Sequence, residues 1–235
     1  MAKVKKEKKS ETLPITLTDT HGNVTANYTA EMVDTIKNTV ATNATDSELM
    51  MFLSVANKYD LDPFLGEIYF VKYDTKSQIV SSRDGYRKIA KRQPNFLKCQ
   101  SMEVCANDTF KTTMEMGEVT NITHEFSQND RGAIVGAYAI LKTTDGQSYY
   151  TYVDIKEYDT RQNAWRKYKS AMIKKVAETQ LYKQFADING IQPEEAMPKG
   201  YDFDNNTNLP SDEEMLDVEI VEEPEAPYNE ETDTE

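Results

Sequence analysis

The sequence predicts an α+β fold: a small antiparallel sheet with packed helices, a long C-terminal basic helix and disordered termini. Three observations lead to this prediction. Apolar residues recur at helical spacing in separated segments, and between these segments lie runs in which apolar and polar residues alternate as they do in strands. The C-terminal end is dominated by acidic residues. A length of 235 residues suits one domain with tails.

The net charge of −13 is unevenly distributed along the chain. Residues 201–235 contain 14 acidic and no basic residues, whereas residues 1–9 contain five lysines and one glutamate. The remainder is nearly balanced, so the acidity says little about the surface of a folded domain. We therefore expect a flexible polar and basic arm at residues 1–28, a core domain at 29–197 and a disordered acidic tail at 198–235.

The expected helices share apolar residues three and four positions apart, and they cover residues 30–40, 47–59, 83–93 and 163–186. The second helix should begin at a capping box, Thr45-Asp46-Ser47-Glu48, and the third should end before Pro94. The expected strands are bounded by turn residues and cover residues 67–73, 78–81, 96–106, 109–116, 119–126 and 132–142. A further hairpin should turn at residues 144–146.

Several kinds of chemistry lack a sequence signature. No Gly-x-x-x-x-Gly-Lys-Ser/Thr motif for ATP phosphates occurs, and His21 and His124 do not combine with Cys99 and Cys105 in a zinc-binding spacing. No apolar run approaches the roughly 20 residues of a membrane span, and no apolar stretch follows the basic residues 1–9 as in a signal peptide. We expect no catalytic or metal site, no cofactor, no membrane partner and a reducing cytoplasm.

Acidic residues at Asp60 and Asp62, and at Asp154, Glu157 and Asp159, are the alternative candidates for chemistry. Carboxylates of this kind bind the ions of a metal-dependent nuclease. However, Asp60 and Asp62 bracket the end of a predicted helix, and the second group has ordinary helix-surface spacing. Structural roles for these residues are therefore favoured.

The predicted helix at residues 83–93 has one strongly basic side. On a helical wheel, Tyr86, Ile89 and Ala90 cluster together. The opposite arc carries four cations and no acid, namely Arg87, Lys88, Lys91 and Arg92. A solvated face usually mixes charges of both signs, so this arc favours contact with phosphates. Arg83, at the start of the same helix, is included in the predicted DNA-binding set.

The last predicted helix is also basic, but its wheel is less regular. The predicted DNA-binding cations of this helix are Arg166, Lys167, Lys174 and Lys175. Arg161, just before the helix, is included with them. Trp165 has two alternatives: it can stack on a base, or it can belong to the core through an apolar stripe that also includes Tyr168 and Met172. Trp165 is kept among the candidate DNA-binding residues.

Four separated blocks of the sequence carry a family resemblance. They are Thr45–Leu49, Val55-Ala56-Asn57-Lys58-Tyr59-Asp60-Leu61-Asp62-Pro63-Phe64 with Glu67-Ile68-Tyr69, Asp84-Gly85-Tyr86 with Ile89, and Trp165 followed by Ala171-Met172-Ile173-Lys174-Lys175. In order and spacing they resemble the RecT/Red beta family of phage single-strand annealing recombinases over about residues 30–197. Gly66 stands where some members have a cation, so no DNA role is carried over to that position.

The resemblance implies a function without enzymatic catalysis. Members of this family anneal complementary single strands without ATP during phage recombination, and they assemble as homo-oligomeric rings or helical filaments. The implied partners are single-stranded DNA, the annealed duplex intermediate, and an accompanying exonuclease or host single-strand binding protein. Besides the nuclease, the sequence leaves open a single-stranded nucleic-acid binding protein that does not anneal, and a structural protein with incidental cations.

Overall fold

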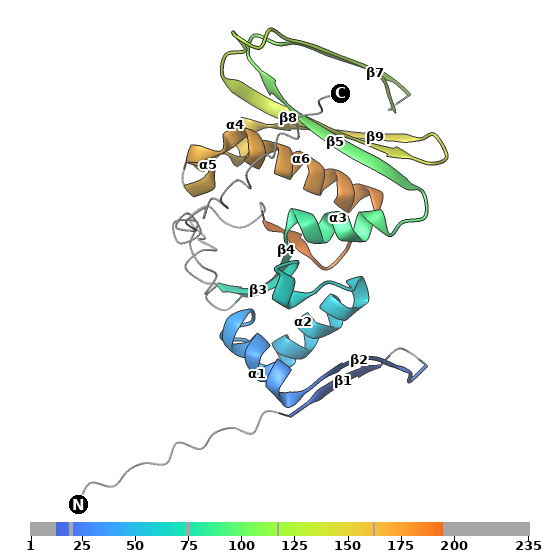
Figure 1. Cartoon of the computed structure of the whole chain (residues 1–235), viewed down its shortest axis with the longest axis vertical. Helices are drawn as coiled ribbons and strands as arrows, with labels where there is room; N and C mark the ends of the chain where they lie inside the picture. The colour runs from blue at the N-terminus through green and yellow to red at the C-terminus, as the bar shows by residue number, and fades with distance from the viewer. Residues whose placement is uncertain (1–12, 19–20, 74–75, 117, 162, 195–235) are drawn as a thin grey trace, which may run out of the picture. The chain divides into compact units, whose positions relative to one another are not determined.

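The computed structural model describes residues 13–18, 21–73, 76–116, 118–161 and 163–194 (Figure 1). Its α-helices are α1 (Ala30–Thr39), α2 (Asp46–Tyr59), α3 (Arg83–Lys91), α4 (Ile155–Tyr158), α5 (Asn163–Lys167) and α6 (Lys169–Phe185), and the 3-10 helix η1 spans Pro63–Leu65. Its strands are β1 (Ile15–Thr18), β2 (Val24–Tyr28), β3 (Ile68–Tyr73), β4 (Lys76–Ser81), β5 (Phe96–Cys105), β6 (Thr109–Glu115), β7 (Glu118–Glu125), β8 (Ile134–Thr143), β9 (Ser148–Asp154) and β10 (Gln192–Pro193). The mixed α+β content with small sheets is as predicted.

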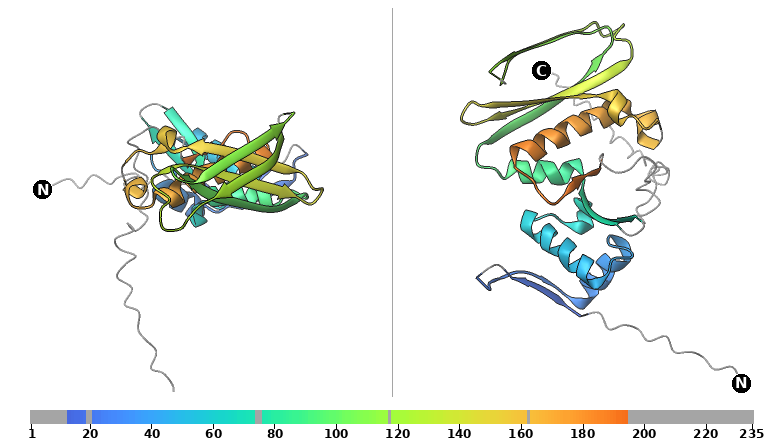
Figure 2. Two further views of the ribbon diagram at one scale, coloured as in Figure 1. Left: turned by 90° about the horizontal axis from the view of Figure 1, so that it is seen from above. Right: turned by 180° about the vertical axis from the view of Figure 1, so that it is seen from behind.

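A three-stranded antiparallel sheet, here called the central sheet, has the strand order β5-β8-β9. Helix α6 packs on one face of this sheet, and α3 packs against α6 (Figure 1). The β6-β7 hairpin lies over the other face, where Phe110 stacks on Tyr138 and Tyr152 with ring centroids 5.2 and 5.8 Å apart (Figure 2). The sheet therefore has a helical side and a hairpin side.

A second small sheet joins the middle of the chain to the segment after α6. Strands β3 and β4 form an antiparallel hairpin, and β10 pairs with β4 in parallel. Helix α2 begins at the predicted capping box, in which Thr45 and Glu48 each bond the other's backbone N–H. It ends at Asp60, which has a left-handed conformation with φ 48°. The predicted hairpin and capping box are confirmed.

Residues 15–28 differ from the expected flexible arm. Strands β1 and β2 pair in antiparallel register, with Leu17 opposite Ala26, and the buried Leu17 side chain joins the core. Gly22, with φ 83°, lies between the two strands. Alternating apolar residues therefore anchor a segment whose many Thr and Asn residues suggested a coil. The rest of the expected arm, residues 1–12, and the expected acidic tail lie outside the described residues.

The expected continuous helix at residues 163–186 is divided at Tyr168. This residue leaves helical geometry, with φ −128° and ψ 44°, and separates α5 from α6. Trp165 is only 8% exposed, whereas Tyr168 is 59% exposed. An unbroken helix would put these two rings, three positions apart, on one face.

The strands at residues 96–142 also differ from the expected single sheet, because β6 and β7 form a separate pair.

Candidate nucleic-acid interface

Helix α3 is held firmly by its buried side. Ser82 caps the helix, its Oγ accepting a hydrogen bond from the Gly85 backbone N–H at 3.3 Å. A Cβ at Gly85 would lie 2.3 Å from both the Glu67 carbonyl oxygen and Ser81 Oγ, so only glycine permits this approach to β3 and β4. Tyr86 is fully buried and donates from its hydroxyl to the Ile191 carbonyl at 3.0 Å. The opposite side of α3 is thereby presented outward.

The exposed side of α3 borders an open depression of about 430 Å³. Its lining residues are four cations and two acids, namely Arg87, Lys88, Lys91, Arg92, Glu67 and Asp84. The four cations predicted to share an arc are thus brought to one place. The two carboxylates were not expected there, because Glu67 is distant in sequence and Asp84 is at the helix start.

The four cations differ in how they are engaged. Lys88 forms an ion pair with Glu67 at 2.6 Å. Arg92 forms an ion pair with Asp60 and donates to the Tyr59 carbonyl at 3.0 Å. Arg87 and Lys91 are exposed and form no ion pair with any described residue. These two are therefore the most available for an external anion.

A second, smaller depression of about 200 Å³ adjoins the first, because Asp84 lines both. It lies between the start of α3 and α6, where it contains Arg83 and Lys175. Arg83 pairs with Asp84 at 3.0 Å and approaches Glu178 at 3.7 Å, while Lys175 pairs with Glu194 at 2.5 Å. Six predicted DNA-binding cations therefore line adjoining surfaces.

The other candidates lie elsewhere. Lys174 forms an ion pair with Glu103 of β5 at 3.3 Å. Arg161, with φ 59°, precedes α5, and Arg166 and Lys167 belong to α5; all three are exposed but line neither depression. Trp165 requires a correction, because its indole is packed in the hydrophobic core. Burial favours its packing role, and a stacking role is not proposed.

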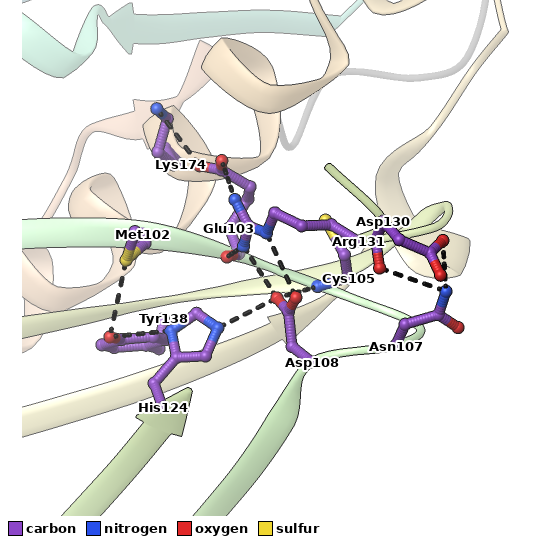
Figure 3. A network of polar contacts seen from close by, with 10 residues as sticks. All are labelled: Met102, Glu103, Cys105, Asn107, Asp108, His124, Asp130, Arg131, Tyr138 and Lys174. Atoms are coloured by element: carbon purple, nitrogen blue, oxygen red, sulfur yellow. Dashed lines mark hydrogen bonds and ion pairs between the residues drawn. The ribbon is translucent and has the colours of Figure 1, made fainter. Parts of the chain in front are cut away.

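A buried polar network lies near Lys174 and was not predicted (Figure 3). Glu103 accepts from Arg131 at 2.9 Å, and Arg131 also donates to Asp108 at 2.7 Å. The Asp108 side chain is fully buried and lies 3.0 Å from Nε2 of His124. Hydrogen bonds from the Arg131 guanidinium hold the pKa of the Asp108 carboxyl well below its usual range. Arg131 and Asp108, at the middle of this network, lie in loops, so periodicity gave no signal for it.

Nδ1 of the same histidine lies 3.2 Å from the hydroxyl of Tyr138 on β8. The network therefore connects the loops on either side of the β6-β7 hairpin, strand β7 and the central sheet (Figure 3). Every charged member has a partner of opposite charge or a hydrogen bond, as buried charges require. Its role is to fix the hairpin on the sheet.

Four of the five acidic residues considered for a nuclease, all except Glu157, have structural partners within the ranges that the structure describes. Asp60 ends α2 and pairs with Arg92, and Asp62 accepts from the Phe64 N–H at 2.8 Å to cap η1. Asp154 caps α4 through the Lys156 N–H, and Asp159 pairs with Lys169 at 2.8 Å. Among the described residues, no three His, Cys, Asp or Glu side chains form a group that could hold a metal ion.

The fold is thus an α+β domain that carries a cation-lined surface beside the short helix α3. The RecT family model matches residues 26–213, and the chain belongs to the RecT family. The comparison with curated proteins finds no match. Membership associates the chain with DNA binding and annealing in recombination. No helix in the described part of the chain is long and apolar enough to span a membrane.

The residues that carried the family resemblance serve mainly to build the fold. The Tyr59 hydroxyl donates to the Asn189 carbonyl at 2.7 Å and accepts from the Asn189 N–H at 3.0 Å. Leu61 and Pro63 are buried, and Gly85 allows the close approach of α3. These contacts hold the end of α2 and the segment after α6 in place beside α3, the helix that carries Arg87 and Lys91.

Proposed function

We propose that the protein binds single-stranded DNA along the exposed side of α3 and anneals complementary strands without ATP, in phage-type recombination in the cytoplasm of a bacterial host. The observation that carries this proposal is the depression beside α3, where Arg87 and Lys91 are exposed and free of ion pairs among the described residues. Family membership supplies the context of recombination.

The geometry suits backbone contacts rather than reading of bases. Cations projecting from one helix side attract phosphates regardless of sequence, which gives affinity without sequence preference. Arg87 and Lys91 are available at once, whereas Lys88 must exchange Glu67 for a phosphate. Arg83 and Lys175, in the adjoining depression, extend the same surface after a similar exchange. We therefore expect strong salt dependence and little discrimination between DNA sequences.

Annealing needs no covalent chemistry at this surface. Pairing of complementary strands is itself favourable, and the obstacles are mutual phosphate repulsion and secondary structure within each strand. A cationic surface that holds a strand extended reduces both obstacles. The proposed activity is therefore templating, with no cofactor and no catalytic residue.

A single copy of the chain offers a short cationic path, since the two adjoining depressions contain six of the predicted DNA-binding cations. Tight binding at physiological salt then requires neighbouring copies along one strand. We propose DNA-linked homo-oligomers, as rings or helical filaments. Binding measured against oligonucleotide length should show affinity rising with length, and a flat, simple isotherm would contradict the assembly.

The deciding experiment mixes two complementary oligonucleotides, one labelled with a fluorophore and the other with a quencher, with and without protein. The proposal expects faster duplex formation with ATP absent. Binding without acceleration would support the alternative of a protective single-strand binding protein. Loss of full-length labelled DNA in the presence of magnesium or manganese would support a nuclease.

A further inference from the structure

One end of the central sheet carries two lysines directly opposite each other. In the antiparallel register, Lys98 of β5 faces Lys142 of β8, and Lys142 faces Ser148 of β9. Opposed side chains in such a pair have Cβ atoms about 4.5–5.5 Å apart, and like charges at this spacing repel. All three residues are exposed, and neither lysine forms an ion pair with a described residue. The fold thus keeps an uncompensated positive pair in place.

Ordinary protection of a sheet edge does not account for this pair. Lysines are often placed on edge strands, where they discourage pairing with another chain. This explains Lys98, because β5 is an edge strand. It does not explain Lys142, because β8 is the central strand and hydrogen bonds to neighbours on both sides.

The row of the pair and the row next to it contain no acidic residue on the sheet itself. The neighbouring row across the sheet is Gln100, Ile140 and Tyr150. Asp145, in the turn between β8 and β9, is instead engaged with the buried Thr143, whose hydroxyl donates to it. Neither lysine therefore has an ion-pair partner among the residues that the structure describes.

The pair lies at the end of β5 that follows α3, but on the hairpin side of the sheet, opposite the side on which α6 and α3 pack. The chain runs from the end of α3 directly into β5, and α3 and β5 are in contact (Figure 1). The register shifts between Phe96 and Lys98, and the intervening Leu97 is 55% exposed beside the lysines. The β6-β7 hairpin covers the same sheet face at Tyr138 and Tyr152 and reaches the row next to the lysines, where the Thr112 hydroxyl lies 3.3 Å from the Tyr150 hydroxyl. Lys98, Lys142 and Ser148 themselves remain exposed.

We infer that Lys98 and Lys142 together bind a backbone phosphate of a second DNA strand, while the α3 surface holds the first. This inference rests on the proposed function. Two lysines at directly opposed positions of neighbouring strands can share one anion, and Ser148 adds a hydroxyl donor to the row. The second strand would then approach the first around the β5 edge, from the hairpin side of the sheet. Neutralising its phosphates at this point lowers the repulsion that opposes pairing.

The test is the double variant Lys98→Gln with Lys142→Gln, which keeps side-chain length while removing both charges. Its matched control is Lys111→Gln with Lys156→Gln, which removes two exposed lysines that form no ion pair with described residues. Binding of a single labelled oligonucleotide and the rate of annealing with its complement are measured for both variants. Unfolding midpoints verify the fold, and that of the sheet variant should equal or exceed the wild-type value because repulsion is relieved.

The expected result is annealing slowed about fivefold at 0.1 M salt relative to the control, with unchanged affinity for the first strand. Equal annealing rates in the two variants, with an active wild type, would overturn the inference alone. Slower annealing explained fully by weaker first-strand binding would also overturn it, because the lysines would then extend the α3 surface. A wild-type protein that binds single strands but does not anneal would overturn the proposed annealing function and the second-strand site together.

Discussion

The Lys88 ammonium lies 2.6 Å from the Glu67 carboxylate, although the two residues are separated by a hairpin in the sequence. Glu67 also accepts from the Asp62 N–H at 2.8 Å, so its carboxylate is fixed at the edge of the depression beside α3. A cation that would contact DNA is therefore held by an internal anion. Binding of a phosphate at Lys88 must compete with this ion pair.

Replacing Glu67 by Gln should tighten binding of single-stranded DNA. The amide oxygen still accepts from Asp62, but the negative charge beside Lys88 is removed. One cation released for a phosphate corresponds to about fivefold in affinity at 0.1 M salt. Titration of a labelled oligonucleotide at several salt concentrations measures the effect, which should shrink as salt rises.

Glu48→Gln is the matched control for that variant. It removes a carboxylate that pairs with Lys72 at 2.9 Å and that does not line the depression. The amide can retain the backbone bond to Thr45. If both variants bind DNA equally well, Glu67 does not restrain the interface.

Replacing Gly85 by Ala should destabilise the fold by about 1–3 kcal/mol, because the new methyl group would overlap backbone and side-chain atoms. The nearest two atoms, the Glu67 carbonyl oxygen and Ser81 Oγ, are each 2.3 Å from the required position. The free energy of unfolding in denaturant measures the loss. Gly146→Ala, in a turn with no atom within 4 Å, controls for the loss of a glycine, although its positive φ adds strain of its own. An unchanged stability of the Gly85 variant would contradict the close packing of α3.

Asp108 should make stability depend on pH in the acid range. Its pKa is held well below the usual value, chiefly by hydrogen bonds from Arg131. A depressed pKa contributes stability that is present above the unfolded-state value of about 4 and lost as the pH falls through the folded-state value. Asp108→Ala breaks a buried ion pair and should cost about 3–5 kcal/mol near neutral pH.

The comparison of wild type with Asp108→Ala is made by denaturant unfolding near pH 7 and again below pH about 4. The difference in unfolding free energy should narrow as the pH falls below about 4, because the unfolded wild-type chain then binds a proton at Asp108 that the folded chain, with its depressed pKa, does not bind. Glu125→Ala, on the exposed side of the strand that carries His124, serves as the control. A difference that is constant across this range would show that the charge of Asp108 is not what stabilises the network.

The acidic C-terminal segment should compete with DNA. Residues 201–235 carry 14 acidic and no basic residues. A polyanion tethered to a cationic surface has a high effective concentration, commonly in the millimolar range for short linkers. Deletion of residues 201–235 should therefore tighten DNA binding at low salt, and less so at high salt where charges are screened over about 8–10 Å. Equal affinities of the two proteins at low salt would leave a solubilising or partner-recruiting role.

Local patterns predicted the parts of the fold that local chemistry determines. The capping box at Thr45, the β3-β4 hairpin and the boundaries of α3 follow from residues a few positions apart. Strands β1 and β2 were missed because their apolar residues are interrupted by Thr and Asn, and only packing of Leu17 in the core reveals them. Tyr168 was predicted to belong to an apolar stripe, but the helix breaks at this residue.

The sequence predicted the cations of the candidate site but not the acidic residues beside them. The cations of α3 are consecutive on a wheel, so periodicity found Arg87 and Lys91. Tertiary packing places the carboxylate of Glu67 beside these cations, and a helical wheel cannot show such a neighbour. The same reason hides the opposition of Lys98 and Lys142, since it depends on the register between β5 and β8.

The salt dependence of single-strand binding by the double variant Arg87→Gln with Lys91→Gln tests the central claim most directly. These two exposed cations are free of ion pairs among the described residues, so their loss disturbs no described salt bridge. The slope of log affinity against log salt concentration should fall in magnitude by about 0.7 for each lost contact, and similarly for all DNA sequences. Lys111→Gln with Lys156→Gln should leave the slope near that of the wild type. A wild-type slope for the Arg87 and Lys91 variant, with the fold intact, would contradict the assignment of α3 as the DNA-binding surface.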